Sequence, residues 1–112
     1  MASGSYELFN HSVVATAALT QARAVTAAGA LPAAAGRCLG FAKFAAAVGE
    51  RVNVAVLGST VAEAGAAIGV GVPLELDALG RVITRAAGVT VGSALGAAAA
   101  AGDKIEIVLI AN

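Results

Sequence analysis

The sequence is poor in charged side chains, and those it has cancel in sign. Charged residues make up 12% of the 112 positions, with seven basic and seven acidic side chains, whereas an ordinary soluble domain has about 25% charged residues. Because there is no basic patch and no run of Lys or Arg, a nucleic-acid partner is not expected. Hydrophobic residues reach 59%, which leaves too little polar surface for a lone protein in water. Such a chain either enters a membrane or is covered by other protein.

Long hydrophobic runs are also missing, which argues against a membrane. No stretch of about 18 apolar residues is uninterrupted by charge. The first residues, MASGSYELFNHS, contain neither a basic region nor an apolar core, so no secretory signal is predicted. We therefore expect a protein made in a reducing cytoplasm and covered by neighbours in an oligomer or a larger assembly.

The residues that most often carry chemistry are scarce. A lone cysteine, Cys38, cannot form an internal disulfide and belongs to no metal-binding cluster, so we expect a small buried residue. His11 is the one histidine and has no catalytic partner near it in the sequence. Glu75 and Asp77 share a strand face and could bind a cation, but we interpret them as a solvated hairpin edge. We predict no catalytic, cofactor-binding or metal-binding residues and no enzyme activity.

What the chain does contain is a series of short β-like runs separated by glycine. The clearest alternation is in RVNVAVLG, which places Val52, Val54 and Val56 on one face of a strand. VPLELDALGRVITR predicts a hairpin whose turn runs from Asp77 to Gly80. Six or seven strands at this spacing predict an all-β fold, a small barrel or sandwich. The predicted runs are residues 22–28, 38–44, 51–58, 72–85, 88–95 and 103–110.

The first 22 residues follow a different pattern. Their apolar positions fit neither a period of 2 nor one of 3.6, and glycine is absent after Gly4. We interpret residues 1–22 as an extended arm that becomes ordered on a partner surface, and residues 23–112 as the β-rich body.

One phrase occurs twice in the body. Residues 49–54, GERVNV, align with residues 102–107, GDKIEI: a glycine, an acid and a base precede an alternating strand. The two copies are either similar solutions to one turn or a pseudo-repeat that places two equivalent strands. The five alanines before the second copy are too few for an isolated helix. They predict a close-packed crossing into the last strand, with at most one helical turn.

The last strand has two unlike faces. Ile105, Ile107 and Leu109 form one apolar face, whereas the opposite face begins with Lys104 and ends with Val108 and Ile110. The apolar end of this second face needs a cover, which is either the arm or another chain.

Together these segments resemble a family of tailed-phage capsid decoration, or cement, proteins. The resemblance is carried by LGFAKFAAAVGERVNVAVLG, by VAEAGAAIGVGVPLELDALGRVIT and by VGSALGAAAAAGDKIEIVLI, and it covers about residues 24–110. It implies a small barrel- or tulip-like body that binds the outside of an icosahedral head and strengthens the expanded shell by bridging capsomers. The implied partners are the major capsid protein and further copies of the chain, a trimer being favoured over a dimer, on the outer surface of the virion. No cofactor is implied.

The residues expected to contact the capsid or another subunit are the apolar side chains of the arm and the apolar end of the last strand. Two other roles stay open: a structural module of the tail tube or of a fibre, and a carbohydrate-binding module on the virion. The absence of tryptophan argues against the carbohydrate-binding module. The predicted contact residues are Tyr6, Leu8, Phe9, Val13, Val14, Leu19, Val108 and Ile110.

Overall fold

The computed structural model describes residues 6–110 and contains one eight-stranded sheet with no helix in that range. The predicted all-β fold is confirmed, and the sheet curls into a half-barrel. The strands are β1 (Tyr6–Val14), β2 (Ala24–Val25), β3 (Gly40–Ala42), β4 (Arg51–Glu63), β5 (Pro73–Leu76), β6 (Val82–Thr84), β7 (Gly92–Ala94) and β8 (Lys104–Leu109). No helix in the described part of the chain is long and apolar enough to cross a membrane.

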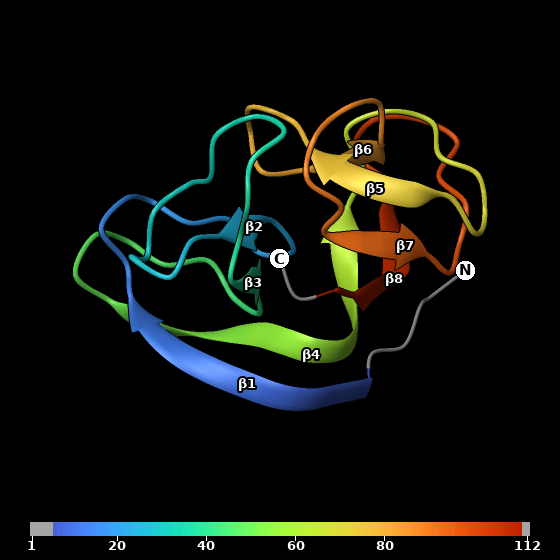
Figure 1. The fold of residues 1–112 in the computed structure, drawn as a ribbon. Helices are drawn as coiled ribbons and strands as arrows, with labels where there is room; N and C mark the ends of the chain where they lie inside the picture. The colour runs from blue at the N-terminus through green and yellow to red at the C-terminus, as the bar shows by residue number, and fades with distance from the viewer. Residues whose placement is uncertain (1–5, 111–112) are drawn as a thin grey trace.

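The sheet is organised around β4, the longest strand. The order is β2-β3-β4-β8-β7-β5-β6, and β1 also pairs with β4. In Figure 1, β1 and β4 run together along the lower side, with β2 and β3 to the left and β5 to β8 to the right. Residues 51–59 of β4 pair with β1, and residues 59–63 pair with β8. One strand therefore joins two groups of strands.

Gly58 allows β4 to be this long. Its φ of 96° lies in the left-handed region that glycine adopts without a steric penalty. Before Gly58, Ala55 faces the larger core cluster, while after it Ala62 and Ala64 face the same cluster. Side chains alternate between the two faces of a regular strand, so an odd-numbered and an even-numbered residue would point to opposite faces. The strand therefore changes its inward face at Gly58. The sequence suggested that the strand ended here, because glycine usually interrupts a strand.

The structure shows that the duplicated phrase belongs to an internal repeat, here called the first repeat (residues 13–56) and the second repeat (residues 62–109). In the first, the amide of Ala15 donates to the carbonyl of Glu50, and that of Gly49 donates to Ala15, each at 2.8 Å. In the second, Ala64 donates to Asp103 at 2.7 Å and Gly102 to Ala64 at 2.8 Å. The left-handed glycines match as well, with φ of 91° at Gly49 and 94° at Gly102.

The correspondence extends through both repeats. Leu19 and Ala46 form an antiparallel bridge in the first, as Ile68 and Ala98 do in the second. Ala22, with φ of 66°, occupies the left-handed position that Gly71 holds in the second repeat, with φ of 84°. Of the five alanines at residues 97–101, Ala98, which bridges to Ile68, is buried and the other four are exposed. The predicted close-packed crossing is therefore wrong for most of this run.

Each repeat has its own apolar cluster, and the second repeat's cluster is enlarged by the first repeat. Every buried residue of the smaller cluster has a counterpart in the larger one. Val13, Ala15, Leu19, Val25, Ala42, Ala46, Val52 and Val54 correspond to Ala62, Ala64, Ile68, Leu74, Ala94, Ala98, Ile105 and Ile107. The larger cluster also holds Ala24, Phe41 and Ala55, which lie on the other face of the first repeat. The second repeat therefore packs over that face.

Residues 6–22, predicted as an arm, are joined to this sheet. β1 pairs with β4 from Tyr6 opposite Ser59 to Val14 opposite Arg51, and Val13 and Leu19 are buried in the smaller cluster. Residues 1–5 lie outside the described part of the chain. The role of the segment as an arm toward other proteins stays a prediction.

Candidate interaction surface

The first candidate surface is the beginning of β1, where two predicted contact residues project into solvent. Leu8 is 82% exposed and Phe9 is 49% exposed. The register between β1 and β4 shifts on both sides of Phe9, first between Glu7 and Phe9 and again before Asn10. A bulge leaves its extra residue unpaired and turns it away from the regular pleat. Leu8, which has no Cα partner in this register, is therefore presented outward.

Neighbouring side chains widen this apolar area. Phe9 lies opposite Leu57 of β4, which is also exposed. The rings of Phe9 and His11 have centroids 6.3 Å apart and are tilted by 35°, a distance at which rings interact favourably. We call Leu8, Phe9, His11 and Leu57 the β1 patch.

An ion pair holds the start of β1 in place. Lys43, just after β3, places its Nζ 2.7 Å from Glu7 Oε2, and both side chains are mostly covered. The amide of Lys43 also donates to the carbonyl of Asn53 in β4 at 2.9 Å. β1 is therefore fixed to β4 by the strand ladder and to the end of β3 by charge, directly beside Leu8.

The second candidate surface lies on the outer face of β8. Val108 is 37% exposed and Ile110 is 42% exposed, whereas Ile105 and Ile107 are buried, as predicted. Val108 is opposite Ser59 of β4 and Ser93 of β7, and Ser93 is opposite Pro73 of β5. Residues directly opposite in antiparallel strands share a face. Pro73, Ser93 and Val108 therefore form a row of uncharged residues across three strands, here called the open face.

Comparison with known proteins identifies the family. A model of the phage cement protein family matches residues 6–109, nearly the whole chain. This chain belongs to the phage cement protein family. It is accordingly a structural protein of a phage virion, as the sequence resemblance indicated. Among curated proteins no match was found.

The fold of this cement protein also occurs in a solved phage structure. The N base of the head fibre protein gp8.5 of bacteriophage phi29 superposes with a TM-score of 0.77 at 19% identity. The match covers 91% of this chain and 93% of that one. The two proteins therefore share their overall β fold.

The structure assigns the other predicted contact residues of this cement protein to different places. Val14 is exposed, but Val13 and Leu19 are buried in the smaller core cluster. They were predicted as contacts because the segment was interpreted as separate from the body; once β1 joins the sheet, they become core residues and are not available on the surface. Tyr6 begins β1 opposite Ser59, and its side chain lies outside the described part.

Several exposed apolar side chains were not predicted as contacts. Phe44, Val48 and Val70 are more than half exposed, and each lies in a loop where strand periodicity carries no information. Leu57 was missed because its position just before Gly58 resembled the end of a strand. The signal that could have found Leu57 is the bulge-forming glycine after it.

A shallow hollow of about 370 Å³ lies between the two repeats, lined by Gln21, Lys43, Thr60 and Lys104 together with small apolar residues. Among the described residues no group of three metal-ligating side chains occurs. Cys38, predicted as a small buried residue, packs against the larger core cluster but is only partly buried.

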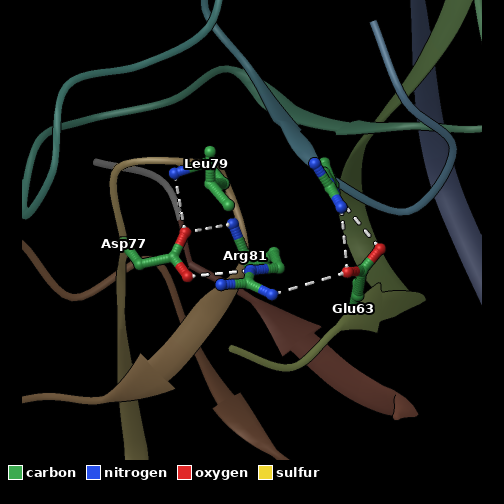
Figure 2. Close-up of polar contacts among 5 residues, drawn as sticks. Glu63, Asp77, Leu79 and Arg81 are labelled. Atoms are coloured by element: carbon green, nitrogen blue, oxygen red, sulfur yellow. Dashed lines mark hydrogen bonds and ion pairs between the residues drawn. The ribbon is translucent and has the colours of Figure 1, made fainter. Parts of the chain in front are cut away.

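A network of charges joins the two repeats. The guanidinium of Arg23 donates from Nε to Glu63 Oε1 at 3.2 Å and from Nη2 to Oε2 at 3.1 Å. Arg81 lies between Asp77 and Glu63, as Figure 2 shows. Its Nε donates to Asp77 Oδ2 at 2.9 Å, and its Nη1 is 4.0 Å from Glu63 Oε2. Glu63, at the end of β4, therefore connects Arg23 of the first repeat with the β5–β6 hairpin of the second.

Glu75 has a structural role that sequence reasoning assigned wrongly. It was interpreted as part of a solvated edge, but it is buried, and its Oε1 accepts hydrogen bonds from the amides of Ala86 and Gly88, each at 2.8 Å. These bonds, first that of Ala86 and then that of Gly88, lower the pKa of the Glu75 carboxyl from its ordinary value. The ionised carboxylate thus holds the loop that follows β6.

We expect this carboxylate to make part of the stability pH-dependent. Because its pKa is lower in the folded protein than in the unfolded chain, its contribution is present above the ordinary glutamate pKa of about 4.3. That contribution is lost as pH falls through the lowered folded pKa. Denaturant unfolding of wild type and Glu75→Gln should therefore differ at pH 7 and converge toward pH 3. An equal difference at both pH values would contradict this role.

Proposed function

We propose that this cement protein binds the outer surface of a phage capsid and stabilises the expanded head by bridging neighbouring capsomers. The proposed partners are the major capsid protein and further copies of the chain, with a trimer favoured over a dimer. The role is one of binding rather than catalysis, in keeping with a family of phage structural proteins.

The observation that carries this proposal is the β1 patch. Leu8, which is 82% exposed, and Phe9 project from β1, and β1 is paired with β4 of the body along one edge. Burying a large apolar side chain fully is worth about 1.5–3 kcal/mol, so a rigid patch of this kind gives useful binding energy without an ordering cost. A ligand that binds the assembled shell stabilises it by mass action, and many copies add avidity.

Point substitutions test this proposal better than truncation. Deleting residues 1–20 would remove β1 together with Val13 and Leu19 of the core, so lost binding would not separate contact from folding. Leu8→Asp changes only an exposed side chain. Val70→Asp is a matched control, because Val70 is 66% exposed and lies in the loop between β4 and β5.

We expect Leu8→Asp to weaken binding to expanded heads at least about tenfold, because a carboxylate would have to be desolvated at the contact. Co-sedimentation of purified protein with heads that lack it gives the affinity. Val70→Asp should bind within about threefold of wild type, and thermal unfolding should show both variants folded. Wild-type affinity in Leu8→Asp would contradict the role of the β1 patch, and absence of saturable binding by wild type would contradict capsid binding.

A second candidate role is favoured by the similarity to a phage head fibre base. In that role, the body is the attachment base of a fibre-associated structure on the head rather than a bridge between capsomers. Electron microscopy of heads saturated with the protein distinguishes the roles. A bridge adds density across capsomer junctions and raises the temperature at which the heads break, whereas a base adds isolated density without a change in head stability.

A further inference from the structure

The outer faces of the two repeats have matching backbones but are covered differently. In the first repeat, the row across the sheet consists of Ala24 opposite Phe41 and Phe41 opposite Ala55. All three residues are completely buried. We call this row the covered face. In the second repeat, the equivalent row is the open face, with Pro73 opposite Ser93 and Ser93 opposite Val108.

The two rows occupy equivalent backbone positions. Gly40 and Gly92 stand next to them, and a Cβ at either would overlap a carbonyl oxygen of the neighbouring strand, that of Ala55 or that of Val108. The strands thus approach too closely for a side chain behind both rows. The difference in exposure comes from what lies above them, not from the sheet itself.

The covered face is buried by the β5–β6 hairpin of the second repeat. Leu76 and Val82 belong to the same apolar cluster as Ala24, Phe41 and Ala55. The turn of the hairpin also docks by hydrogen bonding, since the amide of Ala24 donates to the carbonyl of Gly80 at 2.8 Å. Within one chain, therefore, the outer face of one repeat accepts the hairpin turn of the next repeat.

The first repeat contains the corresponding turn. Within its own chain this turn packs on residues 14–16 instead of on a sheet face: Gly29 is buried, and its carbonyl accepts from the Thr16 amide at 2.9 Å. Thr26 accepts from Gly29 at 3.0 Å and donates to Ala30 at 2.9 Å, as Asp77 accepts from Gly80 at 3.2 Å and donates to Arg81 at 2.9 Å. The side chains match as well: the amide of Ala30 donates to Thr26 Oγ1, and that of Arg81 donates to Asp77 Oδ1. The hairpin of the second repeat is longer, but the turns are the same. Val82, which follows the second turn, is buried, whereas Leu31, which follows the first, is exposed together with Ala27 and Ala28.

We propose that a second copy of the chain covers the open face, and that it does so with its turn at residues 26–31. The contact is head-to-tail: the exposed apolar side chains of the turn of one copy pack on Pro73, Ser93 and Val108 of the next. Only the apolar packing that joins the repeats within a chain is repeated, because Pro73, the counterpart of Ala24, has no amide hydrogen to donate. The residues named on the two surfaces are uncharged; the nearest carboxylate on the face of β8, that of Glu106, already accepts a hydrogen bond from Ser59 at 2.9 Å. Because the two surfaces differ, the contact is heterologous, and the copies either close into a ring or extend into a chain.

This inference rests on the self-association included in the proposed function, and it names the surfaces. The self-association is measured without phage heads, so a negative result would not contradict capsid binding. In sedimentation equilibrium, the wild-type protein should self-associate, and Val108→Asp should weaken that association at least about tenfold because a carboxylate would be buried at the contact. Val70→Asp is the control and should associate as wild type does. A monomeric wild type, or unchanged association in Val108→Asp, would overturn the proposal.

Cysteine pairing tests the direction of the contact. In a Cys38→Ser background, Ala28→Cys and Ser93→Cys are prepared as separate proteins, mixed and mildly oxidised, with Ala67→Cys, at another exposed position, replacing Ser93→Cys in the control. A disulfide requires Cβ atoms about 3.5–4.5 Å apart. The proposal predicts covalent dimers in the mixture of Ala28→Cys and Ser93→Cys, and few in either protein alone or in the control mixture. Efficient dimerisation of Ser93→Cys alone shows a face-to-face contact and overturns it, as does a yield no higher than the control.

Discussion

Replacing Gly40 by alanine is expected to destabilise the folded protein strongly. Gly40 lies in β3, where a Cβ would overlap the carbonyl oxygen of Ala55 and come within 2.8 Å of its carbon and 2.9 Å of Val54 Cγ1. Two of these atoms belong to the backbone of β4, so no change of rotamer relieves the clash. Overpacking of a core usually costs about 1–3 kcal/mol, and we expect at least the upper end of that range here.

The measurement is the midpoint of thermal or denaturant unfolding, with a second glycine as the control. At Gly96, the nearest atoms to an added Cβ are at 3.9 and 4.0 Å, and the residue has no left-handed φ. Gly96→Ala should therefore unfold close to wild type, whereas Gly40→Ala should lose on the order of 10 °C or more. Equal midpoints for the two variants would show that β3 and β4 are not packed as closely as described.

The second large effect is expected at Glu63. Replacing it by alanine leaves the Arg23 and Arg81 guanidinium groups, which are mostly covered, without their shared carboxylate. Removing one partner of a buried ion pair costs about 3–5 kcal/mol, and because Arg23 and Arg81 keep some contact with water we expect about 2–4 kcal/mol. The free energy of unfolding, measured in denaturant, gives this loss.

A double-mutant cycle separates the ion pair from the loss of packing. The double variant Arg23→Ala/Glu63→Ala should lose less stability than the sum of the two single variants. Each single variant leaves one charged side chain without its partner, whereas the double variant leaves neither of the two. Additive effects would mean that the two side chains do not interact in solution. Because Glu63 contacts both repeats, Glu63→Ala should lower the midpoint of a single cooperative unfolding transition rather than split unfolding into two transitions.

Much of the body could be predicted from the sequence because its strands obey local rules. The alternation of Val52, Val54 and Val56 and that of Ile105 and Ile107 predicted faces that point to the core: all but Val56 are buried, and Val56 is partly buried against the smaller cluster. The turn at Asp77 was also predicted correctly: Asp77 Oδ1 accepts from the Leu79 amide at 2.9 Å, and Gly80 has a φ of 80°. In these segments side-chain periodicity and turn chemistry indicate the same structure.

The features that were missed depend on partners distant in the sequence. β1 did not show a period of 2 because bulges on both sides of Phe9 interrupt its pleat. Glu75 could not be recognised as a loop anchor because its hydrogen-bond donors, Ala86 and Gly88, approach it only after β6 turns back. In the sequence the repeat was recognised at residues 49–54 and 102–107, whereas the equivalences found in the structure are mostly backbone hydrogen bonds across loops of unequal length.

That β4 belongs to both repeats has a consequence for the folding kinetics of this protein. Its first half completes the first repeat and its second half begins the second, so neither repeat is a complete folding unit without the other. β1 must also reach across more than 35 intervening residues to pair with β4, and closure of such long loops slows the formation of a nucleus. We therefore expect refolding to be slow for a chain of this size, in the millisecond-to-second range typical of two-state β proteins of high contact order. In stopped-flow refolding, the two repeats should appear in a single phase.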